Sequence, residues 1–128
     1  MSRSASRAVQ RPRWSVTLLA ASAVAASALP VSTSTSRVVM DDFSYAPAVV
    51  RIPADSLDTV VLLDNVGEAP HEFNVEGLPD GTRIHLLLFP ETVDVPYGLP
   101  PVPAGEYRIV CTLPGHEAAG MVGTLVVG

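Results

Sequence analysis

The chain has 128 residues, of which 48% are apolar, so it is long enough for one domain with a real core. Its formal charge is −5, and all eight basic residues are Arg. Four of them lie within the first thirteen positions, so the remainder carries four Arg against thirteen acidic residues. Nucleic-acid binding needs clustered positive charge, and this composition excludes it.

The first 28 residues have the pattern of a secretory signal peptide. The early Arg residues precede an uncharged, largely apolar stretch at 14–28, which ends in Ala-Ser-Ala, a small-residue cleavage pattern. We therefore expect export to the periplasm, the exterior or the cell surface. An uncleaved segment would instead tether the protein to a membrane. Residues 29–36 are rich in Ser and Thr and predict a flexible leader before a domain at 37–128.

Residues 37–128 predict an all-β sandwich or barrel of seven or eight strands. Short apolar runs alternate with turns that contain Pro, Gly and Asn, and no long helical pattern occurs. The predicted strands are 37–41, 48–52, 58–64, 71–75, 83–88, 92–95, 106–111 and 123–127. Residues 96–103 contain a Pro-Pro pair and predict a loop without regular strand pairing.

Two of these strands alternate between apolar and polar residues. In the strand that begins at His71, Phe73 lies on the same face as the histidine. In the strand that ends at Cys111, Tyr107 and Ile109 lie on the same face as the cysteine. Successive side chains of a strand point to opposite faces, so His71 and Cys111 are both predicted to point into the core.

Cys111 is the only cysteine of the chain, so no internal disulfide can form. In an exported protein, a lone cysteine is an intermolecular link, a reactive thiol or a metal ligand. The sequence Cys111-Thr-Leu-Pro-Gly-His116-Glu-Ala-Ala-Gly-Met121 places a thiolate, an imidazole and a thioether on one loop. A second imidazole would complete the donors of a type 1 copper site, and the inward-facing His71 is the natural candidate.

The loop from Cys111 to Met121 resembles the C-terminal hairpin of the cupredoxins, the group of azurin, plastocyanin and auracyanin. Asn65-Val-Gly-Glu-Ala-Pro-His-Glu-Phe is similar to their first-histidine strand, and Phe43-Ser-Tyr-Ala-Pro with Val50-Arg-Ile-Pro is similar to their opening strands. The resemblance covers about 38–128 and implies a Greek-key cupredoxin sandwich.

The same resemblance implies a ligand set for one type 1 copper ion. His71, Cys111 and His116 would be the equatorial ligands and Met121 the axial ligand. The Cys-x4-His-x4-Met spacing is similar to that of auracyanin-like proteins. Where better-known members have Asn or Asp after the first histidine, this chain has Glu72, which we predict to be exposed to solvent, like Glu117.

This ligand set predicts a protein that shuttles single electrons between redox partners. The resemblance implies docking at the apolar loop around His116, formed by Leu113, Pro114, Ala118 and Ala119. A copper carrier or buffer would use the same ligands, and zinc would accept the Cys and His donors. We expect a monomer. We also expect no enzymatic activity, because copper enzymes need more histidines than the three present. The third, His85, is predicted to be structural or exposed.

Overall fold

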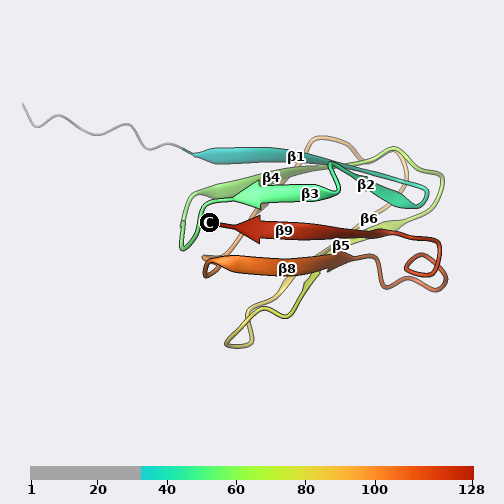
Figure 1. Ribbon diagram of the computed structural model, residues 1–128. Helices are drawn as coiled ribbons and strands as arrows, with labels where there is room; N and C mark the ends of the chain where they lie inside the picture. The colour runs from blue at the N-terminus through green and yellow to red at the C-terminus, as the bar shows by residue number, and fades with distance from the viewer. Residues whose placement is uncertain (1–32) are drawn as a thin grey trace, which may run out of the picture. The chain divides into compact units, whose positions relative to one another are not determined.

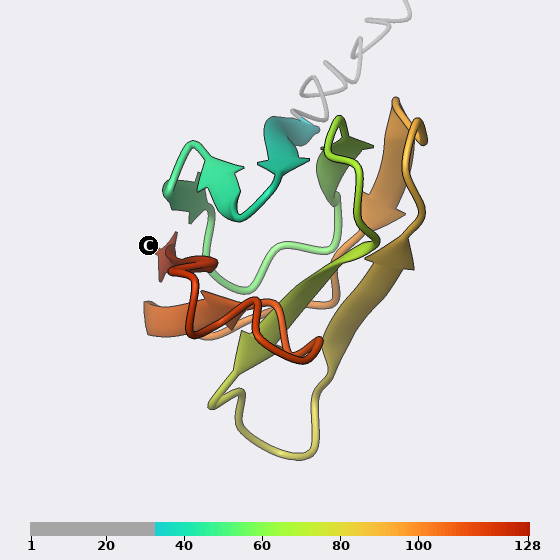
Figure 2. The same ribbon diagram turned by 90° about the vertical axis from the view of Figure 1, so that its right-hand side faces the viewer.

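The computed structural model describes residues 33–128, which form nine strands in two sheets (Figures 1 and 2). The first sheet has the order β2-β1-β4-β7, and the second has the order β3-β9-β8-β5-β6. The strands are β1 Ser34–Asp41, β2 Ser44–Ala46, β3 Val49–Ile52, β4 Thr59–Asn65, β5 His71–Glu76, β6 Ile84–Leu88, β7 Val95–Gly98, β8 Gly105–Val110 and β9 Val122–Val127. The predicted all-β class is therefore confirmed. The predicted signal peptide at 1–28 lies outside the described residues.

Both sheets combine parallel and antiparallel pairs. β1 runs parallel to β4, and β3 runs parallel to β9, whereas the remaining neighbours are antiparallel. The part of the chain that the structure describes contains no helix with the length and hydropathy needed to cross a membrane.

The core lies between the sheets and is lined by the inward faces of their central strands. Fully buried apolar side chains come from both sheets: Val38, Met40, Val61, Leu63, Phe73, Ile109 and Leu125. Burying an aliphatic or aromatic side chain of this size stabilises the fold by about 1.5–3 kcal/mol. His71 is fully buried at one end of this core, on the same face of β5 as Phe73, as the alternation predicted.

Most strand boundaries agree with the sequence prediction to within one residue, and three features differ by more. β1 begins at Ser34, inside the segment that was predicted to be a flexible leader, because residues 34–36 pair in parallel with the start of β4. The short β2 was not predicted, since three residues are too few to show a periodic pattern. The predicted strand at 92–95 lies three residues too early, because β7 spans Val95–Gly98.

The position of β7 also corrects the prediction that 96–103 lacks regular pairing. Pro96 lies opposite Leu62 of β4 in a regular antiparallel register. β7 is the edge strand of its sheet, so it pairs with a neighbour on one side only. Because an edge strand has one unpaired side, a proline there need not remove a hydrogen bond between strands.

Three connecting segments meet at one end of the sandwich, on the right in Figure 1 and toward the viewer in Figure 2. They are the β1–β2 turn at 42–43, the β4–β5 loop at 66–70 and the β8–β9 loop at 111–121. Hydrogen bonds join the first two, since Asp42 accepts from the amides of Glu68 and Ala69, and Phe43 of the same turn packs against His116 of the third. The fold thereby brings residues that are far apart in the sequence to one place.

Candidate metal centre

The sequence-predicted ligands all lie at this end of the sandwich. His71 is the first residue of β5, Cys111 directly follows β8, and Met121 directly precedes β9. All three are fully buried, whereas His116 in the loop between β8 and β9 is half-buried. The strands therefore fix the positions of three residues, and the loop supplies the fourth.

Three donor atoms from different parts of the chain lie close together. Cys111 Sγ lies 3.3 Å from His116 Nδ1, and His71 Nδ1 lies 3.3 Å from the same nitrogen. The donor atoms of the three residues all lie within 4.8 Å of one another, so a single ion could contact all of them. One thiolate with two imidazoles is the donor set of blue-copper centres. The cluster therefore fits the predicted type 1 copper site.

Met121 is held beside this cluster by its backbone. Its amide donates to the His116 carbonyl at 3.1 Å, and its carbonyl accepts from the Cys111 amide at 3.3 Å. The β8–β9 ladder thus closes just below the loop, with Cys111 and Met121 across from each other. The fully buried Met121 supplies the only thioether of the Cys-x4-His-x4-Met sequence.

The ligand loop folds through consecutive turns. The His116 amide donates to the Leu113 carbonyl at 3.1 Å, which closes a turn between Cys111 and His116. Gly115 and Gly120 have φ angles of 84° and 100°, a region that side-chain-bearing residues seldom adopt. These two glycines let the chain reverse on both sides of His116, so their spacing belongs to the motif as much as the donors do.

Glu72 supports the thiol side of the cluster. Its backbone amide donates to Cys111 Sγ at 3.4 Å, and its Oε2 accepts from the Thr112 amide at 2.9 Å and from the Thr112 hydroxyl at 2.5 Å. The prediction that Glu72 is exposed is wrong, because only 9% of the residue is exposed. Alternation correctly pointed it away from the core, but the β8–β9 loop covers that outer face.

The Glu72 carboxylate also explains the position of His85. Glu72 Oε1 lies 3.1 Å from His85 Nε2, whose side chain is 39% exposed. Desolvation raises the pKa of Glu72, but hydrogen bonds from Thr112 and His85 outweigh it and leave the pKa below its usual value. Glu72 is therefore an ionised link between the ligand loop and a histidine near the surface.

Asp42 contacts the other side of the cluster. Its Oδ1 lies 2.7 Å from His71 Nε2 and accepts from the Ala69 amide at 3.2 Å, while its Oδ2 accepts from the Glu68 amide at 2.9 Å. The pKa of Asp42 is lowered, first by the amide of Glu68 and then by Ala69 and His71, against an opposing desolvation effect. An ionised carboxylate thus faces the ring nitrogen of His71 that points away from the cluster.

The His116 ring meets an aromatic side chain and not a carboxylate. Phe43 packs edge-on against His116 with ring centroids 4.7 Å apart, and Phe43 itself is 40% exposed. The predicted exposure of Glu117 agrees with the structure, where it forms an ion pair with Arg108 at 2.6 Å. Tyr107, predicted to pack in the core, lies partly buried at its edge.

Sequence reasoning missed Asp42 and Phe43 as parts of the site. Both belong to a short turn whose sequence carries no signal for a contact with His71, at the start of a strand almost thirty residues further along the chain. Gly67 carried a weak signal, since its loop precedes a predicted ligand. A Cβ at Gly67 would lie 2.7 Å from His71 Nε2, so this position requires glycine.

Comparisons with known proteins agree with this geometry. The sulfocyanin (SoxE) domain model matches residues 32–128. Reduced auracyanin from the photosynthetic bacterium Roseiflexus castenholzii is 20% identical with a TM-score of 0.63, and the match covers 76% of this chain and 98% of that one.

Two further structures share the fold at lower scores. Auracyanin A from Chloroflexus aurantiacus, a blue copper protein, is 20% identical with a TM-score of 0.56 over 73% of this chain and 98% of that one. Plastocyanin from Dryopteris crassirhizoma is 23% identical with a TM-score of 0.52 over 73% of this chain and 100% of that one. No curated protein matches the chain. The family match and the fold together show that the chain belongs to the sulfocyanin (SoxE) domain family of the cupredoxins.

Proposed function

We propose that His71, Cys111, His116 and Met121 bind one copper ion and that the protein passes single electrons between redox partners. The observation that carries this proposal is the convergence of Cys111 Sγ, His71 Nδ1 and His116 Nδ1 within 4.8 Å. Cys and Met donors suit Cu(I), and imidazole suits both oxidation states. Copper supplies a one-electron couple when it is bound in such a site.

The surrounding residues favour electron transfer because they limit rearrangement. Three of the four proposed ligands are fully buried, so water has no access from the core side. The amide of Glu72 donates to Cys111 Sγ, which offsets negative charge on the sulfur. Tyr45 donates its hydroxyl to the Glu72 carbonyl at 2.5 Å and thereby fixes the same strand segment. These contacts hold Cys111 and the neighbouring strand segment in place.

The half-buried His116 provides the route to a partner. Leu113 is half-buried beside it, and Pro114, Ala118 and Ala119 are exposed on the same loop. A hollow of about 690 Å³ lies next to this loop, lined in part by Leu113, Pro114, Ala118 and Arg108. We propose that redox proteins dock here through a small, transient interface. Export of a monomeric protein, with or without a membrane tether, belongs to the same proposal.

An absorption spectrum after addition of Cu(II) tests copper binding. The wild-type protein should show the intense visible band of a copper–thiolate bond, and Cys111→Ser should lose it. His85→Gln is the control, because His85 is the one histidine outside the proposed ligand set. A colourless copper complex of the wild-type protein would contradict the proposal.

Voltammetry then separates an electron carrier from a copper carrier or buffer. Fast and reversible reduction of the bound copper supports electron transfer. Slow or irreversible reduction, or release of the metal on reduction, supports copper carriage. Metal analysis of protein isolated from its native compartment would show whether zinc occupies the site instead.

A further inference from the structure

We propose that Asp42 is a positioning residue of the copper centre, which fixes the orientation of the His71 ring and favours Cu(II) over Cu(I). This inference rests on the proposed copper site. It goes beyond that site because Asp42 contacts none of the other proposed ligands and belongs to a turn outside the ligand loop.

The first support is the geometry of the His71 ring. Its Nδ1 points to the cluster, 3.3 Å from His116 Nδ1, and its Nε2 points to Asp42 Oδ1 at 2.7 Å. A carboxylate accepts but does not donate, so the proton of a neutral His71 must lie on Nε2. That tautomer leaves the lone pair of Nδ1 free for the metal. Asp42 therefore selects the tautomer that a ligand needs.

The second support is the rigidity of Asp42 itself. Its two carboxylate oxygens accept from the amides of Glu68 and Ala69, at 2.9 Å and 3.2 Å, in addition to the contact with His71. The side chain is 26% exposed, and His71 is fully buried. A carboxylate held by three partners keeps its charge and its direction, and it transfers both to the ring.

The third support is the fit of the β4–β5 loop over this contact. A Cβ at Gly67 would lie 2.4 Å from Asp42 Oδ1 and 2.7 Å from His71 Nε2. The backbone of Gly67 therefore lies directly against this hydrogen bond, where a side chain would not fit. The buried His71 end of the contact is away from water, which strengthens the electrostatic effect of the carboxylate on the ring.

The negative charge has a defined consequence for copper. It attracts Cu(II) more strongly than Cu(I), because the oxidised ion carries one more positive charge. A hydrogen bond to a carboxylate also makes the imidazole a stronger donor, which again favours Cu(II). Asp42 should therefore lower the midpoint potential of the centre.

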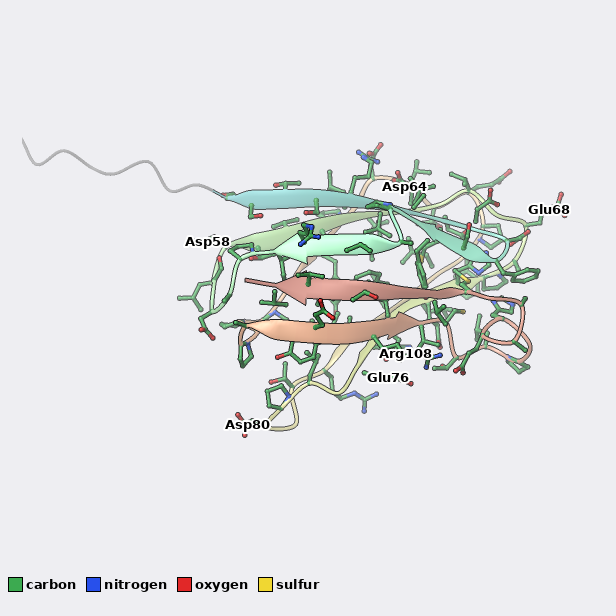
Figure 3. All side chains as sticks on the ribbon, viewed as in Figure 1. Asp58, Asp64, Glu68, Glu76, Asp80 and Arg108 are labelled. Atoms are coloured by element: carbon green, nitrogen blue, oxygen red, sulfur yellow. The ribbon has the colours of Figure 1, made fainter. Side chains whose placement is uncertain are left out.

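The test compares Asp42→Asn with Glu68→Gln in the full-length protein. Asparagine keeps the size of the side chain and loses the charge. Glu68→Gln removes one charge from the same end of the molecule but keeps the backbone amide that donates to Asp42. Figure 3 shows the Glu68 side chain projecting outward. We expect Asp42→Asn to weaken Cu(II) binding about 10- to 100-fold, measured by competition with a chelator of known affinity. If Cu(I) binding is unchanged, a tenfold loss raises the potential by about 59 mV.

Equal effects of Asp42→Asn and Glu68→Gln on Cu(II) affinity and potential would overturn the proposal. A wild-type protein without a copper–thiolate band would instead overturn the copper site itself, so the two failures are distinguishable. If Asp42→Asn does not fold, the nitrogen-15 NMR spectrum of the Cu(I)-loaded wild type decides. We expect a slowly exchanging proton on His71 Nε2; a proton on Nδ1, or one on Nε2 that exchanges at the rate of a solvent-exposed imidazole, would overturn the proposal.

Discussion

The two histidines of the candidate centre have opposite surroundings. His71 belongs to a regular strand, is fully buried, and contacts Asp42 through the nitrogen that faces away from the cluster. His116 belongs to an irregular loop, is half-buried, and packs against the exposed Phe43; within residues 33–128, the hydrogen bonds of its ring all involve Nδ1. The site thus combines a rigid side inside the core with an accessible side at the surface.

This difference suggests a division of tasks between the two sides. The His71 side shares the packing of the core, so changes there should affect both the fold and the metal site. The His116 side is held by turns of one loop, so changes there should affect the metal site while the fold persists. The predictions below test this division, beginning with the largest effect.

Replacing each histidine by alanine should separate the two sides most clearly. His71→Ala leaves a cavity in the core and removes the partner of Asp42, so we expect the metal-free protein to lose about 2–4 kcal/mol of unfolding free energy. His116→Ala should cost less than about 1 kcal/mol, because the residue is partly exposed and lies outside the core. Denaturant unfolding of the metal-free variants measures both values. Equal losses would refute the division.

The glycine beside His71 provides the next test. Gly67→Ala forces a methyl group toward Asp42 and His71, and overpacking of this kind costs about 1–3 kcal/mol. It should also weaken copper binding, since the His71 ring has to move. Gly98→Ala in β7 is the matched control, because a Cβ there meets no atom within 4 Å and the backbone φ is not in the left-handed region. Similar stability for the two variants would show that the loop over His71 yields easily.

Acid should weaken the support behind His71. Asp64 is the penultimate residue of β4, and its pKa is lowered by the amide of Asp94 and by Arg37, against an opposing desolvation effect. The neighbouring Asn65 side chain bonds to the Ala69 carbonyl, which connects Asp64 to the loop before His71. Figure 3 labels Asp64 on the upper strands.

A depressed pKa means that the unfolded chain binds more protons than the folded one as the pH falls. The stability that Asp64 contributes is therefore present above its unfolded pKa and is lost as the pH drops through its folded pKa. We expect the unfolding free energy of the metal-free protein to fall below about pH 4, and to fall less steeply in Asp64→Asn. Denaturant unfolding at a series of pH values checks this. An identical slope of unfolding free energy against pH in the variant would show that Asp64 does not contribute to the acid sensitivity.

The features that the sequence predicted well are those with a local pattern. Cys111, His116 and Met121 lie on one loop, so their spacing alone brought them together. His71 followed from strand alternation, because period-two patterning places every second residue on the core side. The cluster of His71, Cys111 and His116 in the structure agrees with that reasoning.

The features that the sequence did not predict depend on contacts between distant segments. Asp42 has the sequence context of an ordinary turn residue, and only the fold shows that this turn lies beside the β4–β5 loop. Glu72 was expected to be exposed because alternation describes a strand alone, whereas a loop from another part of the chain covers its outer face. β7 was misplaced because proline is excluded from central strands, and only the topology shows that this strand is an edge.

The smallest effect should come from the ion pairs that restrain the accessible side. Arg108 on β8 contacts Glu76 on the neighbouring strand at 3.2 Å and Glu117 on the ligand loop at 2.6 Å, and Figure 3 shows Arg108 beside Glu76. Its pKa is raised first by Glu117 and then by Glu76. Exposed pairs contribute little to global stability, so Arg108→Ala should leave the unfolding free energy nearly unchanged.

The loop itself should respond more than the fold does. Without Arg108, residue 117 is free to move together with the adjacent His116. We therefore expect amide hydrogen exchange in the variant to become faster at 112–121 and to change little in the strands. Arg51→Ala is the control, because Arg51 is an exposed arginine of β3 without an ion pair inside residues 33–128. High salt should produce the same loop acceleration in the wild type and little further change in Arg108→Ala, since screening weakens the same contacts. Unchanged exchange in the variant would mean that the turns and glycines of the loop hold His116 without help from the neighbouring strand.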